Sequence, residues 1–189
     1  MSKAMDDRPV TGSDSIPAEP VDALDPGLPV AVLLAGGEDD LGLRSLGIFS
    51  LTQAASFRQM LLISIGVVDY AIIDAGTDQE RGFEGTEEAK RLRQKTRASL
   101  DPLIASARQL GLKTDCRISI ATDPVSEIDS LSDEIAGIYP KAVFFVSKLV
   151  FEKPRWYQRL LFGNRSDQIR KRLEKKGFPV TVLPVVVPR

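Results

Sequence analysis

Residues 123–146 read DPVSEIDSLSDEIAGIYPKAVFFV, and the fold is decided by the pattern in this stretch. Asp123 and Pro124 form a typical helix start, in which an N-cap carboxylate precedes a proline at the first helical position. Apolar residues then recur with the 3.6-residue period of a helix, and residues 142–146 are continuously apolar. Because strands buried on both faces are typical of parallel sheets, the stretch predicts a helix followed by a parallel strand.

The alternation of strand and helix continues on both sides of this stretch. Helical patterns separate further short runs of apolar or alternating residues, and Gly111 and Gly177 are placed to end two of the helices. These runs predict four more strands, at residues 30–34, 60–65, 116–120 and 180–187. The chain is therefore expected to form an α/β fold, a three-layer doubly wound open sheet of about five mostly parallel strands.

The chain of 189 residues divides by composition into two parts. Residues 1–27 contain four prolines among Ser, Asp, Glu and Gly without an apolar period, so we expect a disordered tail or linker. Residues 28–189 are long enough for one domain with a substantial core. No apolar run approaches the roughly 18 residues of a membrane span, and the N-terminus lacks the apolar core of a secretory signal. A single cysteine can form no internal disulfide, so these features predict a cytoplasmic protein.

Two features of the composition bear on function. The chain has no histidine, which excludes imidazole-dependent triads and removes the commonest ligand of zinc and iron sites. The formal net charge is −1, yet residues 141–189 hold twelve of the 25 Lys and Arg and only three of the 26 Asp and Glu. Such a basic region can contact an anionic partner, although charged runs are more often solvated faces. We expect no enzymatic activity, no metal site and no nucleic-acid partner.

Two stretches resemble the C-terminal half of universal stress proteins: residues 122–148, TDPVSEIDSLSDEIAGIYPKAVFFVSK, and residues 159–187, RLLFGNRSDQIRKRLEKKGFPVTVLPVVV. The ATP-binding members of that family carry G-x2-G-x9-G-S/T after the fourth strand, where the glycines let backbone amides approach phosphates. Gly163 matches the last glycine and Asn164 stands at the Ser/Thr position, whereas Val150 and Lys153 replace the first two glycines. The resemblance implies the family's fold. The departures argue against ATP binding in the usual manner, so no cofactor is expected.

Three stretches, residues 43–69, 110–131 and 144–163, resemble the cytoplasmic C-terminal domain of bacterial amino acid permeases of the amino acid-polyamine-organocation superfamily. The most distinctive phrase is LVFEKPRWYQRLL at residues 149–161, which a His-Asn pair often follows in that family. Phe162 and Gly163 stand at those two positions here. This closer resemblance implies a regulatory appendage of the stress-protein fold, which would lie at the inner face of the membrane if it were linked to a permease.

In such a sheet the ligand site lies at the carboxyl ends of the strands where the strand order reverses, here near residues 35–40 and 147–166. The candidate binding residues are Gly36, Gly37, Lys153, Gly163, Asn164, Arg165 and Ser166. Our first hypothesis is a non-enzymatic regulatory or scaffold domain. The alternative is a nucleotide or cyclic-dinucleotide sensor that uses these residues as a non-standard phosphate site.

Two segments are candidate contacts with partners. Pro184 lies within the last expected strand, Val180 to Val187, and indicates an edge strand through which a homodimer could form. Residues 153–176 interleave cations with aromatic side chains, and they could contact an anionic or membrane-protein partner. In the alternative interpretation of this basic segment, the aromatic residues complete the core and the cations are solvated.

Overall fold

The computed structural model describes residues 23–35, 39–68, 87–151 and 164–187 of the chain. In these ranges five strands form one sheet in the order β3-β2-β1-β4-β5, and every neighbouring pair is parallel. The strands are β1 (Val30–Leu34), β2 (Gln59–Val67), β3 (Lys113–Ala121), β4 (Ala142–Phe151) and β5 (Val180–Val187). The strand order reverses between β1 and β4, which confirms the predicted doubly wound α/β sheet.

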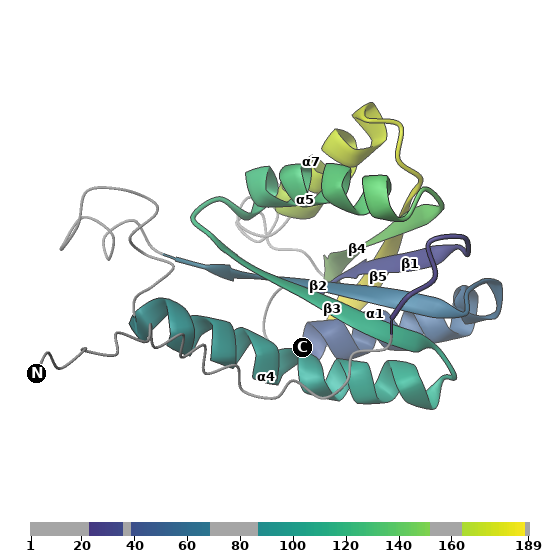
Figure 1. Cartoon of the computed structure of the whole chain (residues 1–189), viewed down its shortest axis with the longest axis horizontal. Coiled ribbons are helices and arrows are strands. Elements are labelled where there is room, and N and C mark those ends of the chain that lie inside the picture. Colours follow the sequence, from purple (N-terminus) through teal and green to yellow (C-terminus); the bar gives the residue numbers. More distant parts are fainter. Residues whose placement is uncertain (1–22, 36–38, 69–86, 152–163, 188–189) are drawn as a thin grey trace, which may run out of the picture.

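Helices cover both faces of the sheet and complete the three layers (Figure 1). They are α1 (Asp39–Thr52), the short 3₁₀ helix η1 (Ala54–Ser56), α4 (Glu87–Gln109), α5 (Pro124–Ile138) and α7 (Asn164–Lys175). Helices α1 and α4 lie on one face, and α5 and α7 lie on the other. None of the helices in the described ranges is both long and apolar enough to cross a membrane.

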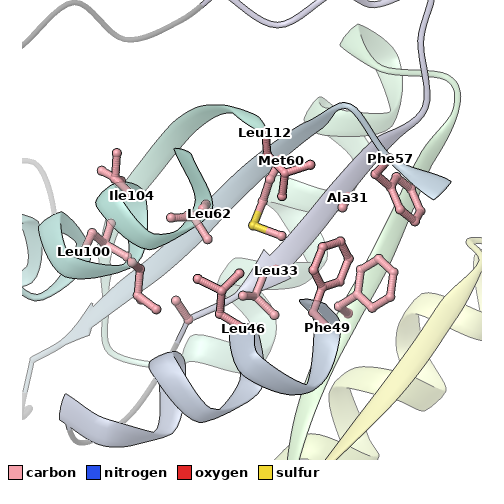
Figure 2. Packing of buried hydrophobic residues seen from close by; sticks show 14 of the residues in the cluster. Ala31, Leu33, Leu46, Phe49, Phe57, Met60, Leu62, Leu100, Ile104 and Leu112 are labelled. Carbon is pink, nitrogen blue, oxygen red and sulfur yellow. The ribbon is translucent and has the colours of Figure 1, made fainter. Parts of the chain in front are cut away.

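The central strand β1 supplies the middle of the core on both faces, since all five of its residues are buried. On the face covered by α1 and α4, Phe49 packs edge-on against Phe145 with ring centroids 5.0 Å apart, and Phe57 lies against both rings. Figure 2 shows this cluster around Met60 and the β1 side chains. Each such buried side chain contributes on the order of 1.5–3 kcal/mol to folding, so this cluster anchors the helix layer to the sheet.

The second half of the core begins earlier in the chain than the expected boundary at residue 28. Leu24 is buried among side chains of β1, α5 and α7. The backbone N–H of Asp25 donates to Gln59 Oε1 at 2.8 Å, and Gln59 Nε2 donates to the carbonyl of Asp25 at 2.7 Å. Contacts with the domain therefore start within the segment expected to be a tail, and the remainder of that segment, residues 1–22, lies outside the described residues.

Local sequence signals set the ends of several elements as predicted. The Asp123 carboxylate accepts a hydrogen bond from the Val125 N–H at 3.0 Å and caps α5. Gly111 and Gly177 follow α4 and α7 with φ of 78° and 85°, left-handed conformations that favour glycine. Gly66 in β2 has another role, because an added Cβ would lie 3.0 Å from Thr96 Oγ1. The small residue lets α4 lie close against β2.

The two edges of the sheet are β3 and β5. Pro184 in β5 is therefore in an edge strand, as its sequence position indicated. The lone thiol, that of Cys116, lies in the other edge strand, β3, and is only half-buried. Its environment still disfavours reactivity. Burial raises the pKa of the Cys116 thiol, and this effect outweighs the neighbouring Arg97 guanidinium, which acts in the opposite direction.

Candidate functional site

A pocket of about 500 Å³ lies at the carboxyl ends of the strands, at the point where the strand order reverses. Strands β1, β2 and β4 form its floor, and the N-terminal parts of α1, α5 and α7 form its walls. The described residues that line it are Leu34, Ala35, Leu41, Ile63, Ile65, Val67, Pro124, Ile128, Val146, Ser147, Arg165, Ser166 and Ile169. The position is the one at which open α/β sheets bind ligands.

Most of the pocket wall is apolar. Ten of the thirteen described lining residues carry aliphatic side chains or proline, and the described lining contains no carboxylate and no thiol. Ile63 and Ile65 project from β2, and Ile128 faces them from the first half of α5. The volume and the apolar lining are typical of a small-molecule site, which usually combines such a wall with a few polar groups.

The polar groups gather at one end of the pocket, where α7 begins beside the end of β4. Arg165 and Ser166 are the second and third residues of α7, and Ser147 lies in β4. The first backbone N–H groups of a helix have no partner within the helix, and the helix dipole makes that end positive. Arg165 is exposed and forms no ion pair with any described residue, so its charge adds to that of the helix terminus.

Hydrogen bonds connect Ser147 to both helices that flank this end. The Ser45 hydroxyl, fully buried in α1, donates to the carbonyl of Leu41 at 2.7 Å. Because that bond uses the only Ser45 proton, Ser147 Oγ must be the donor in the 2.6 Å bond between the two hydroxyls. The Ser166 hydroxyl in turn donates to the backbone carbonyl of Ser147 at 2.8 Å. Ser147 therefore fixes α1 and α7 relative to β4.

Apart from Arg165, charged groups next to the pocket have partners among the described residues at two places. Lys148 Nζ lies 3.0 Å from Asp167 Oδ1, so the first acidic residue of α7 is matched by a cation from β4. At the start of α5, the Asp123 carboxylate accepts from both Val125 and Ser126. The hydrogen bond from the Ser126 side chain, assisted by that from the Val125 backbone, lowers the pKa of Asp123. The positive end of α5 is thus occupied by the protein's own carboxylate.

The structure brings together only some of the candidate residues from the sequence. Arg165 and Ser166 line the pocket, and Asn164 is the first residue of α7. The other four candidates lie outside the described residues: Gly36, Gly37, Lys153 and Gly163. Among the described residues, no cluster of acidic or cysteine side chains could hold a metal ion.

Sequence reasoning missed the contributions of β2 and α5. Ile63, Ile65 and Val67 read as ordinary members of an apolar strand, and Ile128 as one turn of an amphipathic helix. The available signal was their order along the chain. Ile63 and Ile65 lie toward the carboxyl end of one expected strand, and Ile128 lies one turn after the Asp-Pro start of one expected helix. Ligand sites of parallel sheets form at these ends of the strands.

Part of the basic segment 153–176 is used within the domain. Lys176 Nζ lies 3.0 Å from Asp129 and 2.8 Å from Asp133, both on α5, and Arg172 lies 3.9 Å from Asp129. The hydrogen bond to Asp133 raises the pKa of Lys176. The cations of this segment without an acidic partner among the described residues are Arg165, Lys171 and Lys175. The described surface open to an anionic partner is therefore smaller than the charge count indicated.

No protein-family model and no curated protein matches the chain. Among solved structures, it is similar to a universal stress protein from Archaeoglobus fulgidus, with 13% identity over 82% of this chain and 93% of that one and a TM-score of 0.47. It is likewise similar to one from Burkholderia pseudomallei, with 13% identity, 82% and 95% coverage and a TM-score of 0.47. A universal stress protein in complex with cAMP is 16% identical over 84% of this chain and 98% of that one, with a TM-score of 0.41. The fold class rests on the strand order and parallel pairing described above, and these similarities assign no ligand or partner to the chain.

Proposed function

We propose that this chain is a non-enzymatic regulatory domain that responds to a small molecule bound in the pocket between α5, α7 and the sheet. The observation that carries the proposal is the pocket itself, an apolar cavity of about 500 Å³ with one polar end at the switch point of the strand order. An apolar lining, a few convergent polar groups and a position at a switch point are the features typical of a small-molecule site.

The chemistry of the lining supports binding rather than catalysis. Among the described lining residues, Ser147 and Ser166 are the only groups that resemble nucleophiles, and each uses its proton in a hydrogen bond within the fold. No described lining residue could act as a general base toward them, because the lining holds neither a carboxylate nor a thiol and the chain has no histidine. The hydroxyls serve to fix the helices.

The test is a ligand screen by thermal shift on the full chain. The panel contains ATP, AMP, cAMP, a cyclic dinucleotide and a set of apolar monoanions. A ligand that binds only the folded state stabilises it by RT ln(1 + [L]/Kd), about 2.7 kcal/mol at a hundredfold excess over Kd. We expect at least one compound to raise Tm in this manner. If no compound on the panel raises Tm, the proposed function is wrong.

Two variants assign any response to the pocket. Val67 lines it at the end of β2 and is 49% exposed, so Val67→Trp fills the mouth with little cost to the core. Val186 at the end of β5 is 50% exposed and does not line the pocket, so Val186→Trp is the matched control. The shift should disappear in Val67→Trp and persist in Val186→Trp. The reverse pattern would place the ligand elsewhere.

A scaffold role is the second candidate, and it is favoured by edge strand β5. Among the described residues no strand pairs with the outer side of β5, and Val186 near its end is half exposed. Unpaired edges are ready sites for pairing with another chain. We propose that two copies pair through Val180–Val187. We propose further that the binding partner of this dimer is a permease. That part of the proposal rests on the sequence resemblance alone.

A further inference from the structure

The hydrogen-bond donors at the pocket's polar end restrict the class of ligand that it can take. We infer that the pocket takes a mainly apolar molecule with a single anionic group, such as an aromatic or branched-chain carboxylate, rather than a nucleotide. The inference rests on the proposed function, since it names the class of ligand for the same pocket. Three observations on the described residues carry it: the direction of the serine protons, the number of cations without an acidic partner, and the extent of the apolar wall.

Both serine hydroxyls at this end point their protons away from the pocket. Ser147 donates to Ser45 Oγ, and Ser166 donates to the backbone carbonyl of Ser147. Each hydroxyl can still accept a hydrogen bond, but neither can donate one. The only side chain in the described lining that can donate to a ligand is therefore Arg165.

A nucleotide would fit such a lining poorly. The ring nitrogens of a base need donors, and the described wall contributed by β2 and α5 is apolar, with Ile63, Ile65, Val67, Pro124 and Ile128. A buried acceptor left without a donor loses its hydration without compensation, which reduces affinity. An aromatic ring or branched alkyl group has no such requirement and gains from leaving water.

The positive charge that the described residues supply at this end corresponds to about one anionic group. Arg165 has no acidic partner among the described residues, whereas Lys148 is held by Asp167 at 3.0 Å. The N-terminus of α7 adds roughly half a positive charge, while that of α5 is already matched by Asp123. Arg165 and the first N–H groups of α7 would balance the single negative charge of a carboxylate, but not the several negative charges of a triphosphate.

The experiment compares 3-phenylpropionate, indole-3-acetate and 4-methyl-2-oxopentanoate with their neutral primary amides and with AMP, by calorimetric titration of the full chain. At least one carboxylate should bind, and its amide should bind about tenfold more weakly or worse, because a hydrogen bond to a charged group is lost. Arg165→Gln should remove this preference for the carboxylate. The matched control is Lys171→Gln, an exposed cation on α7 outside the pocket, which should keep it.

The alternative outcomes separate the inference from the proposed function. Binding of AMP in the absence of binding by any of the carboxylates would overturn the inference and leave the ligand-responsive domain intact. Equal affinity for a carboxylate and its amide would show that the pocket does not recognise the anionic group. An unchanged preference for the carboxylate in Arg165→Gln would show that Arg165 does not bind it. Absence of binding by every compound would overturn both. Because Arg165 is exposed, its substitution is not expected to impair folding, and unchanged urea unfolding verifies this.

Discussion

Ser147 connects the two helices beside the pocket, and its hydroxyl can be tested by removing it. Ser45 is fully buried, and in Ser147→Ala its oxygen would lose the donor that now lies 2.6 Å away. Leaving a buried polar group with fewer partners costs about 1 kcal/mol. We expect Ser147→Ala to lower the free energy of unfolding by roughly that amount, measured by urea denaturation.

The double variant Ser45→Ala, Ser147→Ala provides the control for that prediction. Replacing both partners of a hydrogen bond by apolar groups is nearly neutral compared with orphaning one of them. The double variant should therefore lose less stability than the sum of the two single variants. Strict additivity would mean that the two hydroxyls do not interact in solution.

At the scale of elements, the start of α5 gives the domain a predictable response to acid. Hydrogen bonds from Ser126 and Val125 lower the pKa of Asp123 in the folded state below its ordinary value. A group of this kind binds protons more readily in the unfolded chain. Its contribution is complete above the ordinary aspartate range near pH 4 and is lost as the pH falls through the lowered folded value.

Asp123→Asn tests this response, because asparagine still caps a helix but does not titrate. Wild-type protein should lose stability between about pH 5 and pH 2, and the variant should lose less of it over the same range. Urea unfolding at a series of pH values measures both curves. Parallel curves would show that the Asp123 carboxylate does not contribute to acid unfolding.

The helix and strand signals that could be predicted from the sequence are local ones. Asp123 with Pro124 specifies a helix start through a side chain and a fixed φ, and Gly111 specifies a stop through its left-handed backbone. The inward faces of the helices could be predicted only in part. Leu43 in α1 and Leu110, which directly follows α4, continue the apolar period of those helices yet are 38% and 43% exposed. Periodicity describes which residues share a face, whereas their burial depends on how far the sheet extends beneath each end of the helix.

The position of the candidate site could be predicted from the sequence, but only some of the residues that line it could be. Arg165 and Ser166 could be named because they open the helix that follows the strand at the switch point. Ile63 and Ile128 could not, since an isoleucine that lines a pocket and one that fills a core follow the same pattern in a sequence. Only the distance between β2 and α5 in space distinguishes the two roles.

At the scale of the whole molecule, the sheet has two edges with different chemistry. In β3 every residue from Asp115 to Ala121 is partly exposed, and Arg117 there is paired with Glu134 of α5 at 2.8 Å. A charged edge of this kind discourages pairing with another chain. In β5, by contrast, six of the eight residues are valine or leucine and none is charged. The contrast favours β5 as the edge through which two copies of the chain associate.

Sedimentation velocity over a range of protein concentrations tests this association. We expect a dimer for the wild type and a shift toward monomer in Val186→Lys, because pairing about a two-fold axis would bring two new like charges onto one continuous sheet. The matched control is Val67→Lys, which adds the same charge at an equally exposed valine of β2, a strand inside the sheet, and should leave the mass unchanged. A wild-type protein that sediments as a monomer at every concentration would contradict the β5 interface. Dissociation by both substitutions would indicate a general effect of net charge, and the edge strand would then not be the contact.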